Sequence, residues 1–440
     1  MSAIGGGTPM PTARTTQLLD KNESVGGRRQ FLGGWRRRWN RMARWQQWLF
    51  LLIVLAAVYY LPVANPWLIT TEPGNDFPIA CFQMAVYALV AVGLNVVVGF
   101  AGLLDLGYIA FFAIGSYTAA FFTSPDSTLI HLPYLWTLPL ALGIAMVFGV
   151  ALGLPTLRLR GDYLAIVTLG FGEIIRILAT IIPAARGQVG FKEVGHPPGT
   201  DAQGHPIFSV SNGTPWYWLA VTIVVVILLL VGNLERSRVG RAWIAIREDE
   251  DAAEIMGVPT FKFKLWAFAI GAGIGGLSGA LFAGQVGFVN NQKFDVATSM
   301  LFVAAVVLGG SGNKVGAILG GAIVAYIPLR FTAIADYKYL LFGVILIILM
   351  IFRPQGLIAA KAHLLTYSRV IGDKIRELRD ARAKPGDPVP AAGTASVTAT
   401  DTADARADGG ALRSDAGSGA GSVGNGPVQD TADGAKGGAE

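Results

Sequence analysis

The sequence is poor in cysteine and in charged residues. Cys81 is the only cysteine among 440 residues, which excludes disulfides within the chain and metal sites built from several cysteines. Asp, Glu, Lys and Arg together make up 15% of the residues, whereas hydrophobic residues make up 52%. A chain of this length has room for two or three soluble domains, but this composition is not typical of soluble domains.

The sequence also lacks the short motifs that bind nucleotides or catalyse hydrolysis. No G-x-x-x-x-G-K-[ST] phosphate loop occurs, and the nearest stretch, Gly309 to Lys314, has the wrong spacing. Nucleophile elbows and H-E-x-x-H motifs are absent as well. His196 and His205 lie in a Gly- and Pro-rich segment without supporting ligands, so we predict no metal site. We therefore expect no enzyme and no cofactor in this chain, and any ATP must be bound by another one.

Long apolar runs are what the sequence does contain. Charges are concentrated in a few loops and in the two tails, and mean hydropathy is +0.50. Most of the runs have about 18 or more nearly uncharged residues, enough to cross a hydrocarbon core of ~30 Å as a helix. We predict an all-α polytopic membrane protein with about ten spans. The runs lie near residues 49–69, 78–98, 106–123, 134–155, 163–183, 216–233, 265–288, 299–312, 316–332 and 339–352.

The basic residues predict the orientation of these spans. If the chain starts inside, an even number of crossings places both termini in the cytoplasm. The loops then placed inside contain Arg158, Arg160, Arg236, Arg238, Arg241, Arg247, Lys262, Lys264 and Lys314. The loops placed outside contain Arg186, Lys192, Lys293 and Lys338. This bias explains the formal charge of +6 through membrane orientation, without a nucleic-acid partner.

One pair of runs leaves the topology open. The run 299–312 would be only ~21 Å long as a helix, which is shorter than the bilayer core. Gly309, Gly310 and Gly312 separate it from the next run. The pair is therefore either two spans or a re-entrant hairpin added to about eight spans.

The regions outside the apolar domain differ from it in composition. Residues 1–48 form a basic, Trp-containing tail that we expect to be largely disordered in the cytoplasm. Residues 49–358 form the transmembrane domain, and 359–384 mix apolar and charged residues as an interfacial helix does. Residues 385–440 contain almost no large apolar side chains, so we expect a disordered tail.

The longest charged segment between spans is the loop 234–264, which the orientation places in the cytoplasm. Asp251-Ala252-Ala253 followed by Gly257 resembles the E-A-A-x-x-x-G coupling motif of ABC import permeases, with Asp in place of Glu. A short helix here would offer Ala252, Ala253 and Ile255 to a groove on an ATPase. The candidate coupling residues are Arg241, Arg247, Glu248, Ala252, Ala253, Glu254 and Gly257.

A few polar residues lie within or beside the spans, where they are costly unless they face a partner or water. Glu173 and Arg176, at i and i+3, either form a structural ion pair or contribute to a solute path. The candidates for a translocation path are Asn95, Asp105, Tyr108, Glu173, Arg176 and Gln285. No chain of carboxylates suggests a proton relay.

Small residues recur every fourth position along the run 265–288. They are Gly271, Gly275, Gly279, Ala283 and Gly287. This spacing forms a flat helix face of the GxxxG type, so we predict close packing against another helix.

Several blocks of sequence, taken in order, carry a family resemblance. They lie at residues 93–120, 157–176, 240–257, 307–316 and 352–357, and the most distinctive begins LRLRGDYL at Leu157. Over roughly residues 78–358 the chain resembles the LivM family, the permease subunits of bacterial branched-chain amino acid ABC importers. It departs from the family pattern at Asp105 and Tyr108, where Ser and His are usual, and in the stretch 183–190.

The resemblance implies a function and a set of partners. The chain would form half of a transmembrane pore in the bacterial inner membrane, importing leucine, isoleucine and valine. It would assemble with a second homologous permease, two cytoplasmic ATPases that bind ATP and Mg²⁺, and an extracytoplasmic solute-binding protein. The departures leave urea, short amides and other amino acids open as solutes. An ion-coupled secondary carrier and a membrane scaffold are the alternatives from other classes.

Overall fold

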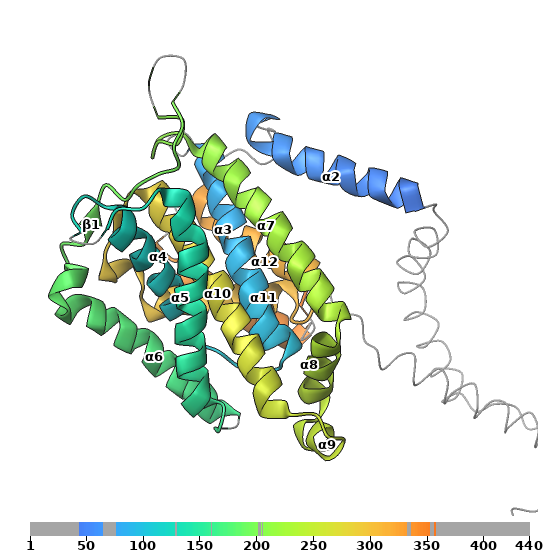
Figure 1. Ribbon diagram of the computed structural model, residues 1–440. Coiled ribbons are helices and arrows are strands. Elements are labelled where there is room, and N and C mark those ends of the chain that lie inside the picture. Colours follow the sequence, from blue (N-terminus) through green and yellow to red (C-terminus); the bar gives the residue numbers. More distant parts are fainter. Residues whose placement is uncertain are drawn as a thin grey trace, which may run out of the picture. The chain divides into compact units, whose positions relative to one another are not determined.

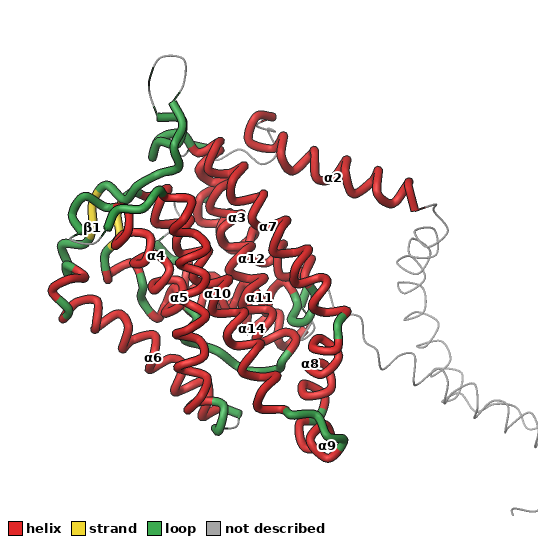
Figure 2. The backbone as a smooth tube through the Cα atoms, viewed as in Figure 1, coloured by secondary structure: helices red, strands yellow, loops and turns green. Residues whose placement is uncertain are grey.

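The computed structural model describes residues 44–64, 76–127, 130–159, 161–200, 204, 206–331, 336–352 and 356–357. Within these residues the fold is mostly helical, and the longest connection lies between the helices that end at Ile181 and begin at Gly213 (Figure 2). Three earlier predictions fall outside them: most of the tail 1–48, the interfacial helix 359–384 and the tail 385–440.

A helix lies in every apolar run. These helices are α2 (Arg44–Ala64), α3 (Phe77–Leu94), α4 (Ile109–Thr123), α5 (Tyr134–Thr156), α6 (Asp162–Ile181), α7 (Gly213–Arg236), α10 (Thr260–Val286), α11 (Val296–Gly309), α12 (Lys314–Arg330) and α14 (Lys338–Phe352). Two further helices connect α7 to α10: α8 (Arg238–Glu248) and α9 (Glu250–Ile255). The short elements are the π-helix η2 (Asn95–Phe100), the 3-10 helices η3 (Pro183–Ala185) and η4 (Asn291–Lys293), and the antiparallel strands β1 (Phe191–Lys192) and β2 (Phe288–Val289).

Six described segments are long and apolar enough to cross a membrane. They are Phe77–Phe100, Tyr134–Thr156, Asp162–Ile181, Gly213–Arg236, Thr260–Val286 and Asn291–Gly309. Shorter apolar helices lie in α2, α4 and α14. The chain is thus a multi-pass helical membrane protein, and the predicted number of spans stays a prediction.

Helix α10 lies at the centre and packs against α3, α4 and α5 (Figure 1). Its small residues allow this packing. A Cβ atom added to Gly279 would lie 1.9 Å from the Phe112 carbonyl oxygen, and one on Gly276 would lie 2.3 Å from the Ala145 Cβ. Of the predicted small-residue face, Gly287 differs: it follows the last residue of α10 with φ +68° and ends the helix.

Three hydroxyl groups, two from α4 and α5 and one from the residue just before α4, donate hydrogen bonds to carbonyl oxygens of α10. Tyr108 bonds to Gly271 at 2.7 Å, and Ser116 to Gly279 at 2.8 Å. The Tyr134 hydroxyl bonds to the carbonyl of Ala280 at 2.9 Å. Hydroxyl-to-backbone bonds of this kind hold helices together where water is excluded. Together with the close packing they fix α3, α4 and α5 around α10.

The chain between η2 and α4 is not helical, although the apolar pattern predicted a helix from residue 106. Its backbone groups are bonded by side chains instead. Leu106 donates its amide to Thr168 Oγ1 at 3.1 Å and accepts a bond from Ser299 Oγ at 2.6 Å. The amide of Gly107 donates to Asp105 Oδ1 at 2.9 Å. An unwound segment among membrane helices is tolerated when protein groups satisfy it in this way.

Helices α11 and α12 form a tight antiparallel hairpin. A Cβ on Gly309 would lie 2.1 Å from the carbonyl oxygen of Gly316, and a Cβ on Gly320 would lie 2.0 Å from that of Ala305. The hairpin packs against α3 through α12. Its turn contains Gly310 and Gly312, both with positive φ. The same packing serves two spans or a re-entrant pair, and the choice between them stays a prediction.

Candidate coupling site

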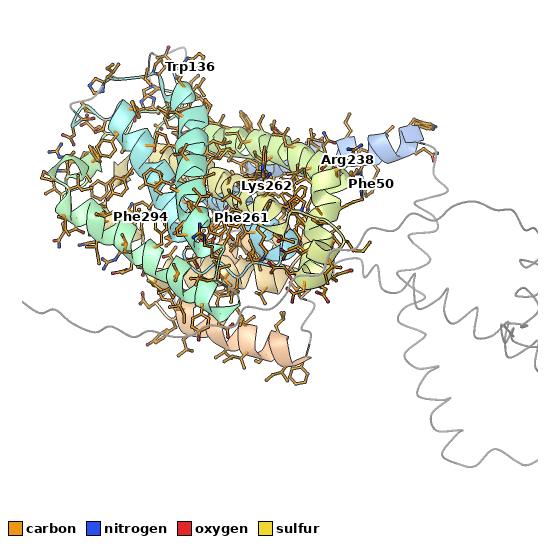
Figure 3. The ribbon with its side chains drawn as sticks, turned by 60° about the horizontal axis from the view of Figure 1, so that its bottom comes forward. Phe50, Trp136, Arg238, Phe261, Lys262 and Phe294 are labelled. Carbon is orange, nitrogen blue, oxygen red and sulfur yellow. The ribbon has the colours of Figure 1, made fainter. Side chains whose placement is uncertain are left out.

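The connection between α7 and α10, residues 237–259, folds into two short helices that we call the hook. It lies at the end of the bundle where α7 ends and α10 begins (Figure 1). Ser237 Oγ caps α8 by accepting a bond from the Val239 amide at 3.1 Å, and Asp249 Oδ1 caps α9 through the Ala252 amide at 3.0 Å. Figure 3 brings this end forward and labels Arg238, Phe261 and Lys262.

Helix α8 is fixed to the transmembrane helices on both sides. A Cβ on Gly240 would lie 2.3 Å from the carbonyl oxygen of Glu235, so α8 turns directly off the end of α7. Trp243 is completely buried, and its indole nitrogen donates to the Phe263 carbonyl of α10 at 2.7 Å. A buried indole with its donor satisfied is a strong anchor. Displacing α8 would therefore move the first turn of α10.

A third contact joins the hook to η2. The Arg247 guanidinium donates to the carbonyl oxygen of Gly99. A Cβ on Gly102 would lie 3.0 Å from Arg247 Cγ, so the arginine stem lies against the chain just after η2. On η2 itself, Asn95 Oδ1 accepts the Gly312 amide at 2.8 Å. The hook is thus linked through η2 to the turn of the α11–α12 hairpin.

Two ion pairs lie at this end of the bundle, one within the attachment of the hook and one between α7 and α12. Lys264 is buried, with 5% of its surface exposed, and it pairs with Glu250 of α9. Lys314, at the start of α12, pairs with Glu235 near the end of α7 at 2.6 Å. Removing one partner of a buried pair leaves an uncompensated charge, which is costly. Arg247, Glu250 and Lys264 also line a cleft of about 180 Å³ beside the hook.

The tip of the hook is exposed and apolar. Ile255 is 85% exposed and Met256 is 83% exposed. The acidic residues Glu248, Asp251 and Glu254 are exposed around them. These two residues are adjacent and lie at the end of a helix whose start is capped by Asp249. The tip therefore presents two apolar side chains surrounded by acidic ones.

One predicted contact is not met in this chain. We expected Ala253 to face a partner, but it is buried with 5% of its surface exposed. Its carbonyl accepts the Val258 amide at 3.0 Å, which folds the chain back over it. Helix α9 has only six residues, too few for the sequence pattern to predict which of its faces is buried. The other predicted coupling residues are exposed: Arg241, Arg247, Glu248, Ala252, Glu254 and Gly257.

The path candidates fall into two groups. The first is buried and bonded to neighbouring backbone: Asn95, Asp105 and Tyr108 as described above, and Gln285, whose Nε2 donates to the Val210 carbonyl at 3.4 Å. The second group is the pair Glu173 and Arg176, whose side chains are 34% and 32% exposed. Neither group lines the cleft beside the hook or the apolar cleft between α5, α7 and α10.

Sequence reasoning missed several residues that hold this region together: Thr168, Trp243, Lys264 and Ser299. Lys264 had a usable signal, because a lysine at the start of an apolar span needs an acidic partner. Thr168 and Ser299 had none, since small hydroxyl residues are common in membrane helices.

The chain matches the protein family described as "Branched-chain amino acid transport system / permease component" over residues 79–350. It is 38% identical over 335 residues to the high-affinity branched-chain amino acid transport system permease protein LivM of Salmonella typhimurium, covering 71% of this chain and 75% of that protein. LivM of Escherichia coli is 38% identical over 328 residues, 70% of this chain and 74% of that protein. BraD of Pseudomonas aeruginosa is 28% identical over 290 residues, 62% of this chain and 91% of that protein. No solved structure matches the chain.

Proposed function

Because the chain belongs to the branched-chain amino acid permease family, we propose that it is a membrane subunit of an ATP-driven importer of leucine, isoleucine and valine. It pairs with a second, homologous permease, and an extracytoplasmic binding protein delivers the solute. Two ATPase subunits on the cytoplasmic side bind ATP and Mg²⁺, and this chain is not itself catalytic. The names of the relatives support the solute.

The observation that carries the proposal is the anchored hook. Its tip, with Ile255 and Met256 exposed, enters a groove on an ATPase. Closure of the ATPases on ATP displaces the hook, and Trp243 passes this displacement to α10. Arg247 passes it to η2, and from there Asn95 passes it to the α11–α12 turn. The bundle then alternates between outward and inward access, a rigid-body mechanism that many transporters use.

This mechanism requires a defined orientation. The hook faces the cytoplasm, both termini are cytoplasmic, and the chain crosses the bacterial inner membrane about ten times. A cysteine introduced by Glu254→Cys tests the orientation, because Glu254 is exposed while the native Cys81 is buried. It should react in inverted vesicles and be protected from an impermeant reagent in intact cells. Labelling in intact cells would overturn the proposal.

Coupling is tested at the tip. The double variant Ile255→Asp, Met256→Asp should insert normally but lose ATPase binding and ATP-dependent leucine uptake, because acidic side chains cannot enter an apolar groove. The matched control is Ile255→Val, which keeps the tip apolar and should keep both. Full uptake by the acidic variant in the assembled complex would show that the tip is not the ATPase contact.

The alternative solutes and functions predict different results in the same uptake measurements. Urea, short amides or other amino acids as solutes would appear as competition with leucine for the binding protein. A secondary carrier would transport solute as the isolated chain in liposomes under an ion gradient. A scaffold would leave uptake unchanged when the chain is deleted.

A further inference from the structure

Helix α6 has two flanks of opposite chemistry. It lies at the edge of the bundle (Figure 1), and only 28% of its most apolar window is buried. Positions i, i+3 and i+7 lie on one side of a helix, and Glu173, Arg176 and Thr180 have this spacing. The rest of the exposed surface of α6 forms an apolar flank, and two of its residues, Ile166 and Ile177, border Glu173. It consists of Tyr163, Ile166, Val167, Ile174, Ile177, Leu178 and Ile181.

The charged flank lies deep in the membrane. Glu173 is eleven positions beyond the start of α6 at Asp162, so it lies ~16 Å along the helix, about halfway across a core of ~30 Å. The Arg176 Nε donates to both Glu173 carboxylate oxygens at 3.1 and 3.0 Å. About a third of each side chain is nonetheless uncovered. Charges exposed to hydrocarbon at this depth are costly, so this flank must face protein or water while the apolar flank faces lipid.

Further polar groups continue the charged flank beyond α6. Thr180 Oγ1 accepts a bond of 2.6 Å from Asn291 Nδ2 of η4. The other amide atom, Asn291 Oδ1, is buried without a partner among the described residues. Asp295, which caps α11, is close enough to Arg176 for electrostatic attraction. A partly open polar strip therefore runs from α6 onto η4 and the start of α11, with charges of both signs.

We propose that this strip, defined by Glu173, Arg176, Thr180, Asn291 and Asp295, recognises a zwitterionic α-amino acid on its way through the membrane. Arg176 binds the α-carboxylate, and Glu173 with Asp295 binds the α-ammonium group. A zwitterion fits because it exchanges one ion pair for two of the same polarity, so no net charge is brought into the membrane. The second permease closes the strip on its open side. This assignment rests on the proposed function.

Accessibility provides the first test, in the assembled importer reconstituted in vesicles. The background variant Cys81→Ala removes the only native cysteine. Thr180→Cys, which keeps the ion pair, should react with a water-soluble thiol reagent about tenfold faster than Leu178→Cys, because a thiol in an apolar environment does not ionise. Leu178 is the matched control, at nearly the same depth on the apolar flank. Equal rates, or faster reaction of Leu178→Cys, would overturn the proposal.

A charge exchange separates recognition from structure. The double variant Glu173→Arg, Arg176→Glu keeps an ion pair at the same spacing but reverses its direction. A purely structural pair would tolerate this exchange, with unchanged leucine uptake. A recognition site should lose uptake by about tenfold or more, the loss expected for misplaced charge-assisted hydrogen bonds, while the complex still assembles.

The wild-type complex distinguishes the two levels of the proposal. If it shows no ATP-dependent leucine uptake, the proposed function fails and the strip is not a path for this solute. If it imports leucine while the exchanged variant imports it equally well, the function stands and the recognition site is wrong. Loss of uptake of leucine by the variant, with assembly intact, supports both.

Discussion

Helices α10 and α6 are similarly apolar and both are long enough to span the membrane, yet the rest of the protein covers them to different extents. The most apolar window of α10 is 78% buried, against 28% for α6. Small residues lie on several sides of α10 and let α3, α4 and α5 approach its backbone. Helix α6 instead has an apolar flank and a charged flank. The position of α10 thus depends on the small size of its side chains, whereas that of α6 depends on which of its sides is charged.

Replacing one glycine in each helix by valine should give the largest difference in stability between the two helices. Gly279→Val in α10 places atoms against the carbonyl of Phe112, so we expect destabilisation of about 3 kcal/mol or more, at or above the usual cost of overpacking. The matched variant is Gly170→Val in α6, where an added Cβ meets nothing within 4 Å. Thermal unfolding of the detergent-solubilised protein measures both. Similar unfolding midpoints for the two variants would remove the distinction.

Removing the ion pair at the N-terminal end of α10 should give the second-largest loss of stability. Glu250→Ala leaves the buried Lys264 without its partner, and because Glu250 is 30% exposed we expect about 2 kcal/mol of destabilisation, below the cost in a fully buried pair. Glu250→Gln should recover part of this loss by accepting a hydrogen bond. Glu248→Ala, in the exposed part of α8, serves as the control and should unfold like the wild type. Unfolding of Glu250→Ala at the wild-type midpoint would contradict the prediction.

A smaller effect is expected for one hydrogen bond to α10. Tyr108→Phe removes the bond to the Gly271 carbonyl, which should cost about 0.6–1 kcal/mol. The same change in α6, Tyr163→Phe, affects a side chain that is 71% exposed and should be neutral. Unfolding in urea and detergent compares them. A larger loss at Tyr163 would indicate a covered face of α6.

The apolar pattern predicted where helices lie because membrane helices need little beyond length and hydropathy. It did not predict the unwound chain before α4, since an apolar run has the same composition whether it is helical or not. Asp105 and Tyr108 suggested a path because they are polar residues beside the spans, but both bond to backbone: Asp105 accepts the nearby Gly107 amide, and Tyr108 donates to the Gly271 carbonyl of α10. The charged pair on α6 was visible in the sequence, but only the structure shows that it remains partly uncovered.

The C-terminal end of α6 should show the smallest effect, and only at acid pH. Asp126 accepts a bond from the Lys192 amide and pairs with Arg186, just beyond α6, and these contacts lower the pKa of its carboxyl group. Its contribution to stability is therefore complete above the pKa of the unfolded chain and is lost as pH falls through the lower pKa of the folded chain. Unfolding midpoints over a pH series should fall slightly more steeply for the wild type than for Asp126→Asn. Identical pH profiles would show that the contact contributes nothing.

The length of α10 has one more consequence. Its 27 residues extend ~40 Å, about 10 Å more than the hydrocarbon core. The helix must therefore tilt, or one of its ends must extend beyond the hydrocarbon core. The end that carries Lys264 is the one joined to the hook. Bilayer thickness then becomes a control on transport, because thicker lipid would draw that end inward and thinner lipid would release it. Leucine uptake by the reconstituted importer should accordingly pass through a maximum as the acyl chains are lengthened.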